Sequence, residues 1–237
     1  MILVTGNGKL AKELVKLSTV EVPIISLSKK DMDITNEYQV SDVIKQYMML
    51  PNFPKYLIHT AALTKPMDIN DRNPILSLDT NIIGTANVAK ICNKYGIKFI
   101  YISTDFVYQV DTDKIINEES PVCPSNKYGW SKLGGECVAK LIENHLILRC
   151  ALCDIPFRHK YAYSDVFRSP ITHKEVANIV LKVKDECGTI NVGNDITTLY
   201  DFVSKYQDIK KGYSKNNTSS IRLCINKLRR IINGKSE

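Results

Sequence analysis

The sequence of 237 residues contains no apolar run long enough to cross a membrane. A transmembrane helix needs about 20 consecutive apolar residues, so we expect no membrane partner. The first residues, Met-Ile-Leu-Val-Thr-Gly, have the apolar run of a strand and lack the basic segment and cleavage site of a secretory signal. Together these absences favour a cytoplasmic protein.

Cysteine is too scattered to form a disulfide framework. The chain has seven cysteines, an odd number without regular spacing, which indicates reduced thiols in a cytosolic compartment. Cys150 and Cys153 form a single C-x-x-C, but neither a second pair nor a histidine cluster accompanies them. The ligand set of a zinc site is therefore missing, and we expect no metal.

An excess of positive charge is concentrated near the end of the chain. The net charge is +7, and a basic surface can attract nucleic acid or anionic nucleotides. Hydrophobic residues make up 44% and charged residues 24%, as in ordinary soluble domains. We expect the basic tail to be the solvated face of a helix, with no nucleic-acid partner; its basic residues are Arg222, Lys227, Arg229, Arg230 and Lys235.

Strand and helix patterns alternate along the chain. The early strands are continuous apolar runs rather than alternating ones, which is typical of a parallel sheet covered on both faces. The apolar spacing predicts helices between them, with Gly96 ending the third. The expected strands are 2–4, 22–27, 55–59, 98–103, 146–148 and 189–192, and the expected helices are 9–17, 36–49, 75–95, 126–144, 174–184 and 199–206.

This alternation predicts an α/β fold, a Rossmann-type doubly wound parallel sheet with a small C-terminal substrate lobe. We expect residues 1–150 to form an NAD(P)-binding Rossmann domain with the catalytic residues. Residues 151–237 would form a reduced substrate-binding lobe and a basic C-terminal segment, interleaved with the sheet. The polar segment 210–220 is predicted to be a loop.

A glycine-rich motif follows the first predicted strand. Gly6, Gly8 and Ala11 form G-x-G-x-x-A and open the first helix, as a dinucleotide-binding fingerprint requires. Gly6 permits the tight turn, Gly8 lets a pyrophosphate approach the backbone, and Ala11 lets the helix pack on the sheet. The cofactor-binding residues predicted here are Gly6, Asn7, Gly8, Lys9 and Leu10.

The end of the second predicted strand selects the cofactor. An acidic residue there would bind the ribose 2′-hydroxyl of NAD, but Ser28, Lys29 and Lys30 occupy the place. Two cations and a hydroxyl suit a 2′-phosphate, so NADP(H) is preferred. Asp31 follows directly, which leaves NAD(H) open.

A Y-x-x-x-K spacing supplies the candidate chemistry. Tyr128 and Lys132 lie four residues apart on a predicted helix and therefore share one face. A fixed ammonium favours the phenolate, so we expect Lys132 to lower the pKa of Tyr128 and suit it to proton transfer. The hydroxyl of Thr104 can donate a second hydrogen bond to a substrate oxygen, so that the trio polarises a carbonyl while a cofactor delivers hydride.

The order of these blocks resembles the extended short-chain dehydrogenase/reductase family, and within it the dTDP-4-dehydrorhamnose reductases. The resemblance covers about residues 1–150. Its blocks are the glycine-rich start, D-M-D-I-T (31–35), H-T-A-A-L-T (59–64), T-N-I-I-G-T (80–85), I-S-T-D-F-V-Y (102–108), Y-G-W-S-K (128–132), G-G-E (134–136) and I-L-R (147–149).

The resemblance implies roles for individual residues. Thr104, Tyr128 and Lys132 would form the catalytic triad, with Asp105 as an auxiliary polar group near the substrate. Lys132 would also hold the nicotinamide ribose. The further cofactor-binding residues implied are Asp33 and Ile34 near the adenine, Ala61, Ala62 and Thr64 along the crevice, Asn81 in the supporting network, and Tyr128.

The implied reaction moves hydride from NADPH to the C4 keto group of a nucleotide-linked 4-keto-6-deoxyhexose, and Tyr128 would protonate the new alkoxide. The implied partner is a nucleotide-sugar substrate, in a pathway of deoxysugar nucleotide biosynthesis. A homodimer, and a separate 3,5-epimerase as pathway partner, stay open.

The sequence departs from the family pattern after Arg149. The segment from Cys150 to Ser169 is short for a substrate-contacting loop and helix, and Phe167-Arg168 replaces a glycine-containing turn. Two alternatives therefore stay open. One is a catalytically silent NADP-binding subunit resembling the methionine adenosyltransferase β-subunit. The other is a bifunctional epimerase/reductase, against which stands Asp105, where such enzymes add a cysteine.

Overall fold

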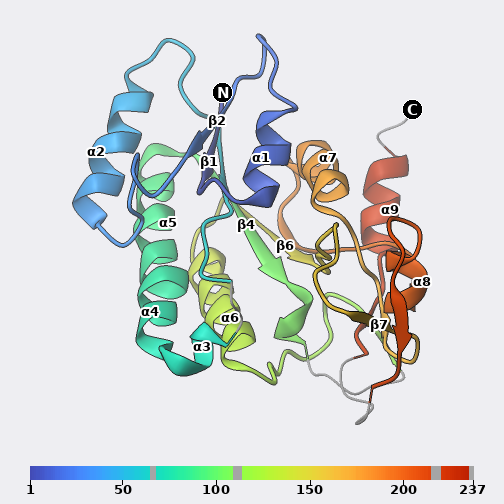
Figure 1. Ribbon diagram of the computed structural model, residues 1–237. Coiled ribbons are helices and arrows are strands. Elements are labelled where there is room, and N and C mark those ends of the chain that lie inside the picture. Colours follow the sequence, from blue (N-terminus) through green and yellow to red (C-terminus); the bar gives the residue numbers. More distant parts are fainter. Residues whose placement is uncertain (65–67, 109–113, 215–219, 235–237) are drawn as a thin grey trace.

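The computed structural model describes residues 1–64, 68–108, 114–214 and 220–234 of the chain (Figure 1). Its centre is a sheet of six parallel strands in the order β2-β1-β3-β4-β6-β9. This confirms the predicted doubly wound α/β fold. The strands span Ile2–Thr5 (β1), Ile24–Leu27 (β2), Tyr56–His59 (β3), Lys98–Thr104 (β4), His145–Cys150 (β6) and Gly188–Val192 (β9).

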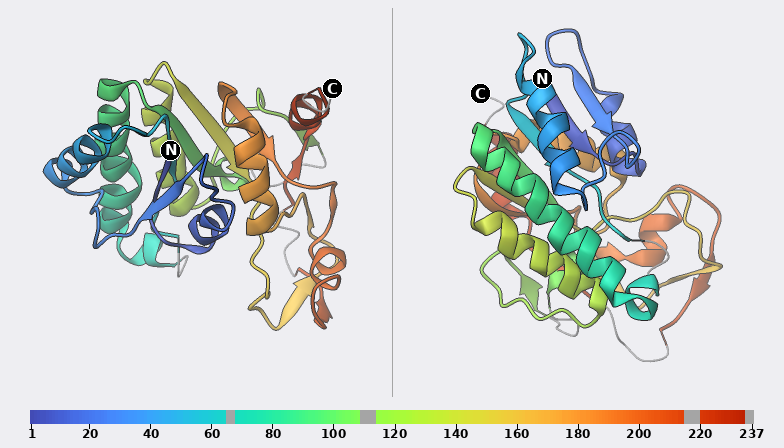
Figure 2. Two further views of the ribbon diagram at one scale, coloured as in Figure 1. Left: turned by 90° about the horizontal axis from the view of Figure 1, so that it is seen from above. Right: turned by 90° about the vertical axis from the view of Figure 1, so that its left-hand side faces the viewer.

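Helices cover both faces of the sheet, as the view from above in Figure 2 shows. One apolar cluster packs α1 and α7 against one face, and a second packs α2, α5 and α6 against the other. The strands are apolar on both sides because both faces are buried. The helices span Lys9–Val15 (α1), Glu37–Met48 (α2), Gly84–Tyr95 (α5), Lys127–Lys140 (α6), His173–Val183 (α7) and Asn226–Asn233 (α9, beside α7).

The long helix predicted over 75–95 is divided by a π-helical turn. Helix α4 (Pro74–Leu78) leads into the π turn (Asp79–Ile83), and α5 continues to Gly96, whose φ of +66° ends the helix as predicted. Such turns are rare and frequently lie at functional sites. This one holds Asn81, whose side chain is buried.

Two predicted helices end three or more residues earlier in the structure. Helix α6 stops at Lys140 rather than Asn144 because the chain must turn there to enter β6, and the Asn144 carbonyl accepts a hydrogen bond from the Phe99 amide at 3.0 Å. Helix α8 (Leu199–Val203) stops before Tyr206. None of the helices in the described part of the chain has the length and apolar character needed to span a bilayer.

The lobe is built from two-stranded pairs that join distant segments. The prediction of a loop over 210–220 is wrong at its start, because Lys210–Gly212 (β11) pairs with Tyr161–Tyr163 (β7); residues 215–219 lie outside the described ranges. The other pairs are Ile115–Ile116 (β5) with Arg222–Leu223 (β12) and Phe167–Arg168 (β8) with Thr197–Thr198 (β10). Short helical segments at Ile69–Arg72 (α3) and Asp105–Val107 (η2) complete the elements.

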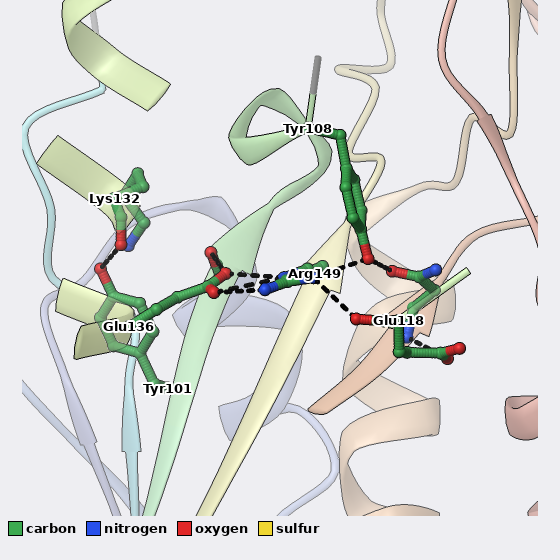
Figure 3. Close-up of polar contacts among 8 residues, drawn as sticks. Tyr101, Tyr108, Glu118, Lys132, Glu136 and Arg149 are labelled. Carbon is green, nitrogen blue, oxygen red and sulfur yellow. Dashed lines mark hydrogen bonds and ion pairs between the residues drawn. The ribbon is translucent and has the colours of Figure 1, made fainter. Parts of the chain in front are cut away.

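A buried ion pair joins the sheet to α6 (Figure 3). Arg149 on β6 and Glu136 on α6 are 2% and 0% exposed. Arg149 Nη2 lies 2.8 Å from Glu136 Oε2, and Arg149 Nε donates to Glu136 Oε1 at 3.0 Å. The Ser103 hydroxyl, on β4, donates to the same carboxylate at 2.6 Å. The pair therefore holds α6 against β4 and β6.

The same arginine reaches toward the C-terminal half of the chain. Arg149 Nη1 donates to the Tyr108 hydroxyl at 2.8 Å, and that hydroxyl donates to Asn191 Oδ1 at 2.8 Å. The backbone amide of Asn191, on β9, donates to Glu118 Oε1 at 2.9 Å. Arg149 on β6 is thus connected through Tyr108 to β9, and through β9 to Glu118.

Replacing Arg149 with Met should lower the free energy of unfolding by about 3–5 kcal/mol, because Glu136 would keep a buried charge without its partner. Urea denaturation measures this loss. Arg229→Met is the matched control. Its ion pair with Asp195 lies at the surface, so its loss should stay below about 1 kcal/mol. Equal losses in the two variants would contradict the role given to the buried pair.

Candidate active site

The glycine-rich loop leaves β1 at the point where the strand order reverses. Strands β2 and β3 lie on opposite sides of β1, and ligands of doubly wound sheets bind outside the carboxyl ends of strands at such a switch point. Gly6 has a φ of +81°, and a Cβ there would lie 3.2 Å from the Ala61 Cα. A Cβ on Gly8 would meet nothing within 4 Å, so the loop has open space beside it for a phosphate.

The end of β2 carries two exposed ammonium groups. The Asp31 carboxylate accepts hydrogen bonds from the amide and hydroxyl of Ser28, at 2.8 and 2.6 Å. These hydrogen bonds lower the pKa of Asp31. Lys29 lies 3.4 Å from Asp33, and both lysine side chains, Lys29 and Lys30, are at the surface. Asp31 is thus engaged by Ser28 and Lys29 lies beside Asp33, while Lys30 is exposed next to them.

Three of the predicted cofactor residues point elsewhere. The side chains of Leu10 and Ile34 are buried in the two apolar clusters, and the Ile34 carbonyl accepts a hydrogen bond from Asn87 at 2.9 Å. Lys9 Nζ forms an ion pair with Asp154 Oδ1 at 3.1 Å. Leu10 therefore has only its backbone available for contact with a cofactor. The contact of Asp33 and Ile34 with the adenine stays a prediction.

Asn81 joins the loop after β3 to α6, the helix that carries Tyr128 and Lys132. Its Oδ1 accepts from the Leu63 amide at 2.7 Å, and its Nδ2 donates to the Leu63 carbonyl and to the Ser131 hydroxyl, at 3.2 and 2.8 Å. The loop between β3 and Leu63 contains Ala61 and Ala62 and leads to Thr64. The supporting network expected around Asn81 is thus present in the geometry, although Ser131 was not among the predicted site residues.

His59 is a second residue that sequence reasoning missed. It is fully buried at the end of β3, with Nδ1 2.9 Å from Thr5 Oγ1 and Nε2 3.1 Å from Thr85 Oγ1. Burial, followed by the nearby charge of Lys132, lowers the pKa of His59 to about 3, so the ring is neutral. The H-T-A-A block, which begins with His59, was the sequence signal for this residue. A histidine at the end of a buried strand needs hydrogen-bonding neighbours, which the sequence reasoning did not look for.

The strand β4 and the helix α6 bring the predicted triad together. Thr104 is the last residue of β4, and the Asn126 side chain caps α6 by accepting from the Gly129 amide at 2.7 Å. A Cβ on Gly129 would lie 2.5 Å from the Phe106 carbonyl oxygen, so α6 approaches the segment after Thr104 closely only because glycine stands there. Tyr128 and Lys132 follow on the first turns of this helix.

The pKa of Tyr128 is raised, which is opposite to the sequence-based prediction. Burial is the main cause and the negative charge of Asp105 adds to it, while hydrogen bonding with Thr104 acts against both. Lys132 does not compensate for them, since its Nζ lies 4.1 Å from the ring centroid of Tyr101. Burial also lowers the pKa of Lys132 to about 7, against the attraction of Glu136. The phenol is therefore protonated at neutral pH.

Asp105 lies beside the triad and is itself buried. Its Oδ1 accepts from the Thr104 hydroxyl at 3.3 Å, and its Oδ2 forms an ion pair with Arg168. Within the described ranges, no group of three or more His, Cys, Asp or Glu side chains is placed to hold a metal ion. The polar groups at this edge of the sheet therefore suit proton transfer and hydrogen bonding.

Comparison with known proteins assigns the chain to a family. A model of the RmlD substrate binding domain matches residues 1–155. The chain belongs to the RmlD substrate binding domain family. This confirms the resemblance to the sugar-nucleotide reductase branch of the extended short-chain dehydrogenase/reductases, and the matched residues include the glycine-rich loop and all of Thr104, Tyr128 and Lys132.

Two curated relatives of this RmlD family chain carry different names. The dTDP-4-keto-6-deoxy-D-glucose reductase of Streptomyces niveus is 28% identical over 136 residues, which are 56% of this chain and 45% of that protein. The methionine adenosyltransferase 2 subunit beta of Xenopus laevis is 32% identical over 119 residues, which are 50% of this chain and 34% of that protein. The chain thus spans less than half the length of these relatives.

A solved structure resembles the RmlD family chain over nearly its whole length. The dTDP-4-dehydrorhamnose reductase of Bacillus anthracis, in complex with NADP, has a TM-score of 0.83 and 26% sequence identity. The similarity covers 96% of this chain and 91% of that one. The lobe after Arg149 therefore shares the general path of a reductase lobe, although the sequence match to the family model ends at residue 155.

The lowered pKa of Lys132 predicts a pH-dependent stability. Its pKa is about 7 in the folded chain and about 10.4 in an unfolded one. Between these values the unfolded chain binds more protons, so stability rises with pH. Between pH 7 and pH 9, the free energy of unfolding of wild type should rise by about 2 kcal/mol more than that of Lys132→Met. Urea denaturation at the two pH values measures this difference.

Lys140→Met is the control variant, because Lys140 is exposed on the same helix. Its free energy of unfolding should change between the two pH values by the same amount as that of wild type. A constant difference between wild type and Lys132→Met would mean that Lys132 keeps its proton up to pH 9, and the assignment of a lowered pKa would be wrong.

Proposed function

We propose that this protein is an NADPH-dependent reductase of the C4 keto group of a nucleotide-linked 4-keto-6-deoxyhexose. The observation that carries the proposal is the placement of Thr104, Tyr128 and Lys132 together at the carboxyl edge of the sheet, beside the glycine-rich loop, in a member of the RmlD family. Residues 1–150 supply the cofactor site and the triad, and residues 151–237 supply the lobe over the substrate.

The residues present fit a dinucleotide cofactor. The open space at Gly8 accepts a pyrophosphate, and the loop held by Asn81 forms the wall of the crevice. Lys29 and Lys30 suit a 2′-phosphate, and the NADP complex of the Bacillus anthracis relative supports the same choice. NAD(H) is the second choice. When bound, the nicotinamide supplies hydride to the keto carbon.

The protein's own residues manage the proton. Tyr128, whose phenol is protonated at neutral pH, gives its hydroxyl proton to the oxygen at C4 as negative charge develops there. Thr104 orients that oxygen by a hydrogen bond from its hydroxyl. Lys132, whose pKa burial lowers to about 7, holds the nicotinamide ribose. Because the phenol of Tyr128 carries its proton at neutral pH, it is in the form that can donate during reduction.

Replacing Tyr128 with Phe should reduce kcat by at least about 100-fold, because it removes the proposed proton donor. NADPH affinity should stay within about twofold, since the ring is retained. NADPH oxidation with dTDP- and UDP-linked 4-keto-6-deoxyglucose, with and without a separate 3,5-epimerase, measures turnover and identifies the nucleotide and the epimer. Fluorescence titration measures cofactor binding.

Tyr161→Phe is the matched control, because it removes an exposed hydroxyl in the lobe; it should keep wild-type turnover. Loss of cofactor binding together with turnover in Tyr128→Phe would mean that Tyr128 supports the fold, and the proposed chemistry would fail.

The double variant Lys29→Ala, Lys30→Ala should weaken NADPH about tenfold or more and leave NADH nearly unchanged, because only NADPH carries the 2′-phosphate. Isothermal titration with both cofactors measures the difference. Lys210→Ala, Lys211→Ala removes the same charge from two exposed lysines of the lobe and should affect neither cofactor. Equal weakening of NADPH and NADH would exclude the two lysines as the 2′-phosphate site.

A second candidate function is an NADP-binding subunit without turnover. The similarity to the methionine adenosyltransferase subunit beta over 119 residues supports it, as does the short lobe. A wild-type chain that binds NADPH but oxidises it with none of the keto sugars would favour this function over the reductase.

A further inference from the structure

An arginine of the lobe contacts the segment that follows the candidate triad. Arg168 lies on β8, and its Nη2 forms an ion pair with Asp105 Oδ2. The side chains are 15% and 1% exposed, respectively, so the two charges meet largely out of water. The pair joins residues 63 positions apart and is one of the contacts by which the lobe meets the carboxyl edge of the sheet.

Arg168 also stacks on the segment that leads to Tyr128. Its guanidinium carbon lies 4.8 Å from the ring centroid of Phe106, and the Phe106 ring meets the Tyr128 ring edge-on at 6.3 Å. The carboxylate that Arg168 holds accepts a hydrogen bond from Thr104 at 3.3 Å. Arg168 is therefore connected to the Thr104 hydroxyl through Asp105 and to the Tyr128 ring through Phe106.

The ion pair with Asp105, rather than hydrogen bonds to other residues, holds Arg168 in position. Its Nε is buried and has no hydrogen-bond partner among the described residues. An unsatisfied buried donor costs free energy, so the attraction of Asp105 and the stacking on Phe106 must outweigh that cost. An arginine serving only to fill the lobe would be expected to have its donors satisfied.

The groups that face Tyr128 have opposite effects on its proton. From η2, Asp105 raises the pKa of Tyr128, and from β6 the Cys150 thiol adds to this. Lys132, on the same helix as Tyr128, is directed over Tyr101. Arg168 is thus the cation that directly opposes the charge of Asp105. Without it, the phenol would face an uncompensated carboxylate.

We propose that Arg168 is a positioning residue of the active site, which neutralises Asp105 and thereby keeps Tyr128 able to release its proton to the substrate. The catalytic consequence rests on the proposed function, but the electrostatic link itself does not. The lobe therefore does more than cover a substrate: it supplies the charge that makes the phenol a usable acid.

The direct test is the titration of Tyr128 itself. The full chain is prepared with 3-fluorotyrosine, whose phenol is more acidic than that of tyrosine, and the ¹⁹F resonance of position 128 is assigned from its loss in Tyr128→Phe. Arg168→Met should raise the titration midpoint of Tyr128 by about one pH unit, which is the size of the pKa change that one nearby charge produces. Asp105→Asn should lower it, and the double variant should return it close to wild type.

Arg222→Met is the matched control. Arg222 stacks on Phe167 at the same 4.8 Å but lies on β12, so its removal should leave the midpoint unchanged. If Arg168→Met does not fold, we compare the midpoint of the double variant with that of Asp105→Asn. Their difference again gives the effect of removing Arg168 on the titration of Tyr128. An unchanged midpoint on removal of Arg168 would overturn the proposal.

The catalytic consequence is measured by the pH profile of NADPH oxidation with the keto sugar. For Arg168→Met we expect kcat at neutral pH to fall about tenfold, with the alkaline limb displaced upward by the same amount as the ¹⁹F midpoint. A fall in kcat with an unmoved limb would mean that Arg168 only clamps the lobe, and would overturn the positioning role. Absence of turnover in wild type would sink the proposed function alone, because the ¹⁹F titration needs no substrate.

Discussion

The buried pair of Arg149 and Glu136 is the constraint on which the site depends. Two charges that are 2% and 0% exposed are tolerated only because each is hydrogen-bonded on several sides. Glu136 belongs to the helix that carries Tyr128 and Lys132, and Arg149 belongs to the strand beside Thr104. The pair therefore sets the distance between the two elements of the triad. Through Tyr108 it is also connected to Asn191 on β9, an edge strand of the sheet.

A local irregularity of the helix before β4 joins two other elements of the fold. A regular helix over 75–95 would place Asn81 by a 3.6-residue period, whereas the π turn Asp79–Ile83 breaks that period. The side-chain amide of Asn81 hydrogen-bonds both Leu63, in the loop after β3, and Ser131 on α6. One buried side chain thus connects that loop to α6.

Burial and neighbouring charges set the protonation of Tyr128 and Lys132. Burial and Asp105 keep the phenol of Tyr128 protonated, while Lys132 lies over Tyr101 and has a pKa near neutrality. The i, i+4 spacing of Tyr128 and Lys132 predicted their shared helix and nearness, but not the sign of the pKa shift. That sign depends on Asp105 and on burial, which no local spacing contains.

What the sequence by itself determined was the alternation of strands and helices and the glycine-rich loop after the first strand, because each rests on local pattern or on short motifs; the same motifs predicted Thr104, Tyr128 and Lys132 as the triad. The ends of helices such as α6, the strand at Lys210–Gly212, and the buried roles of His59 and Ser131 were decided only by the tertiary structure. The ion pair of Arg168 with Asp105 is the clearest case. Its partners are brought together by a lobe whose strand pairs join distant segments, so neither residue carries a local signal of the other.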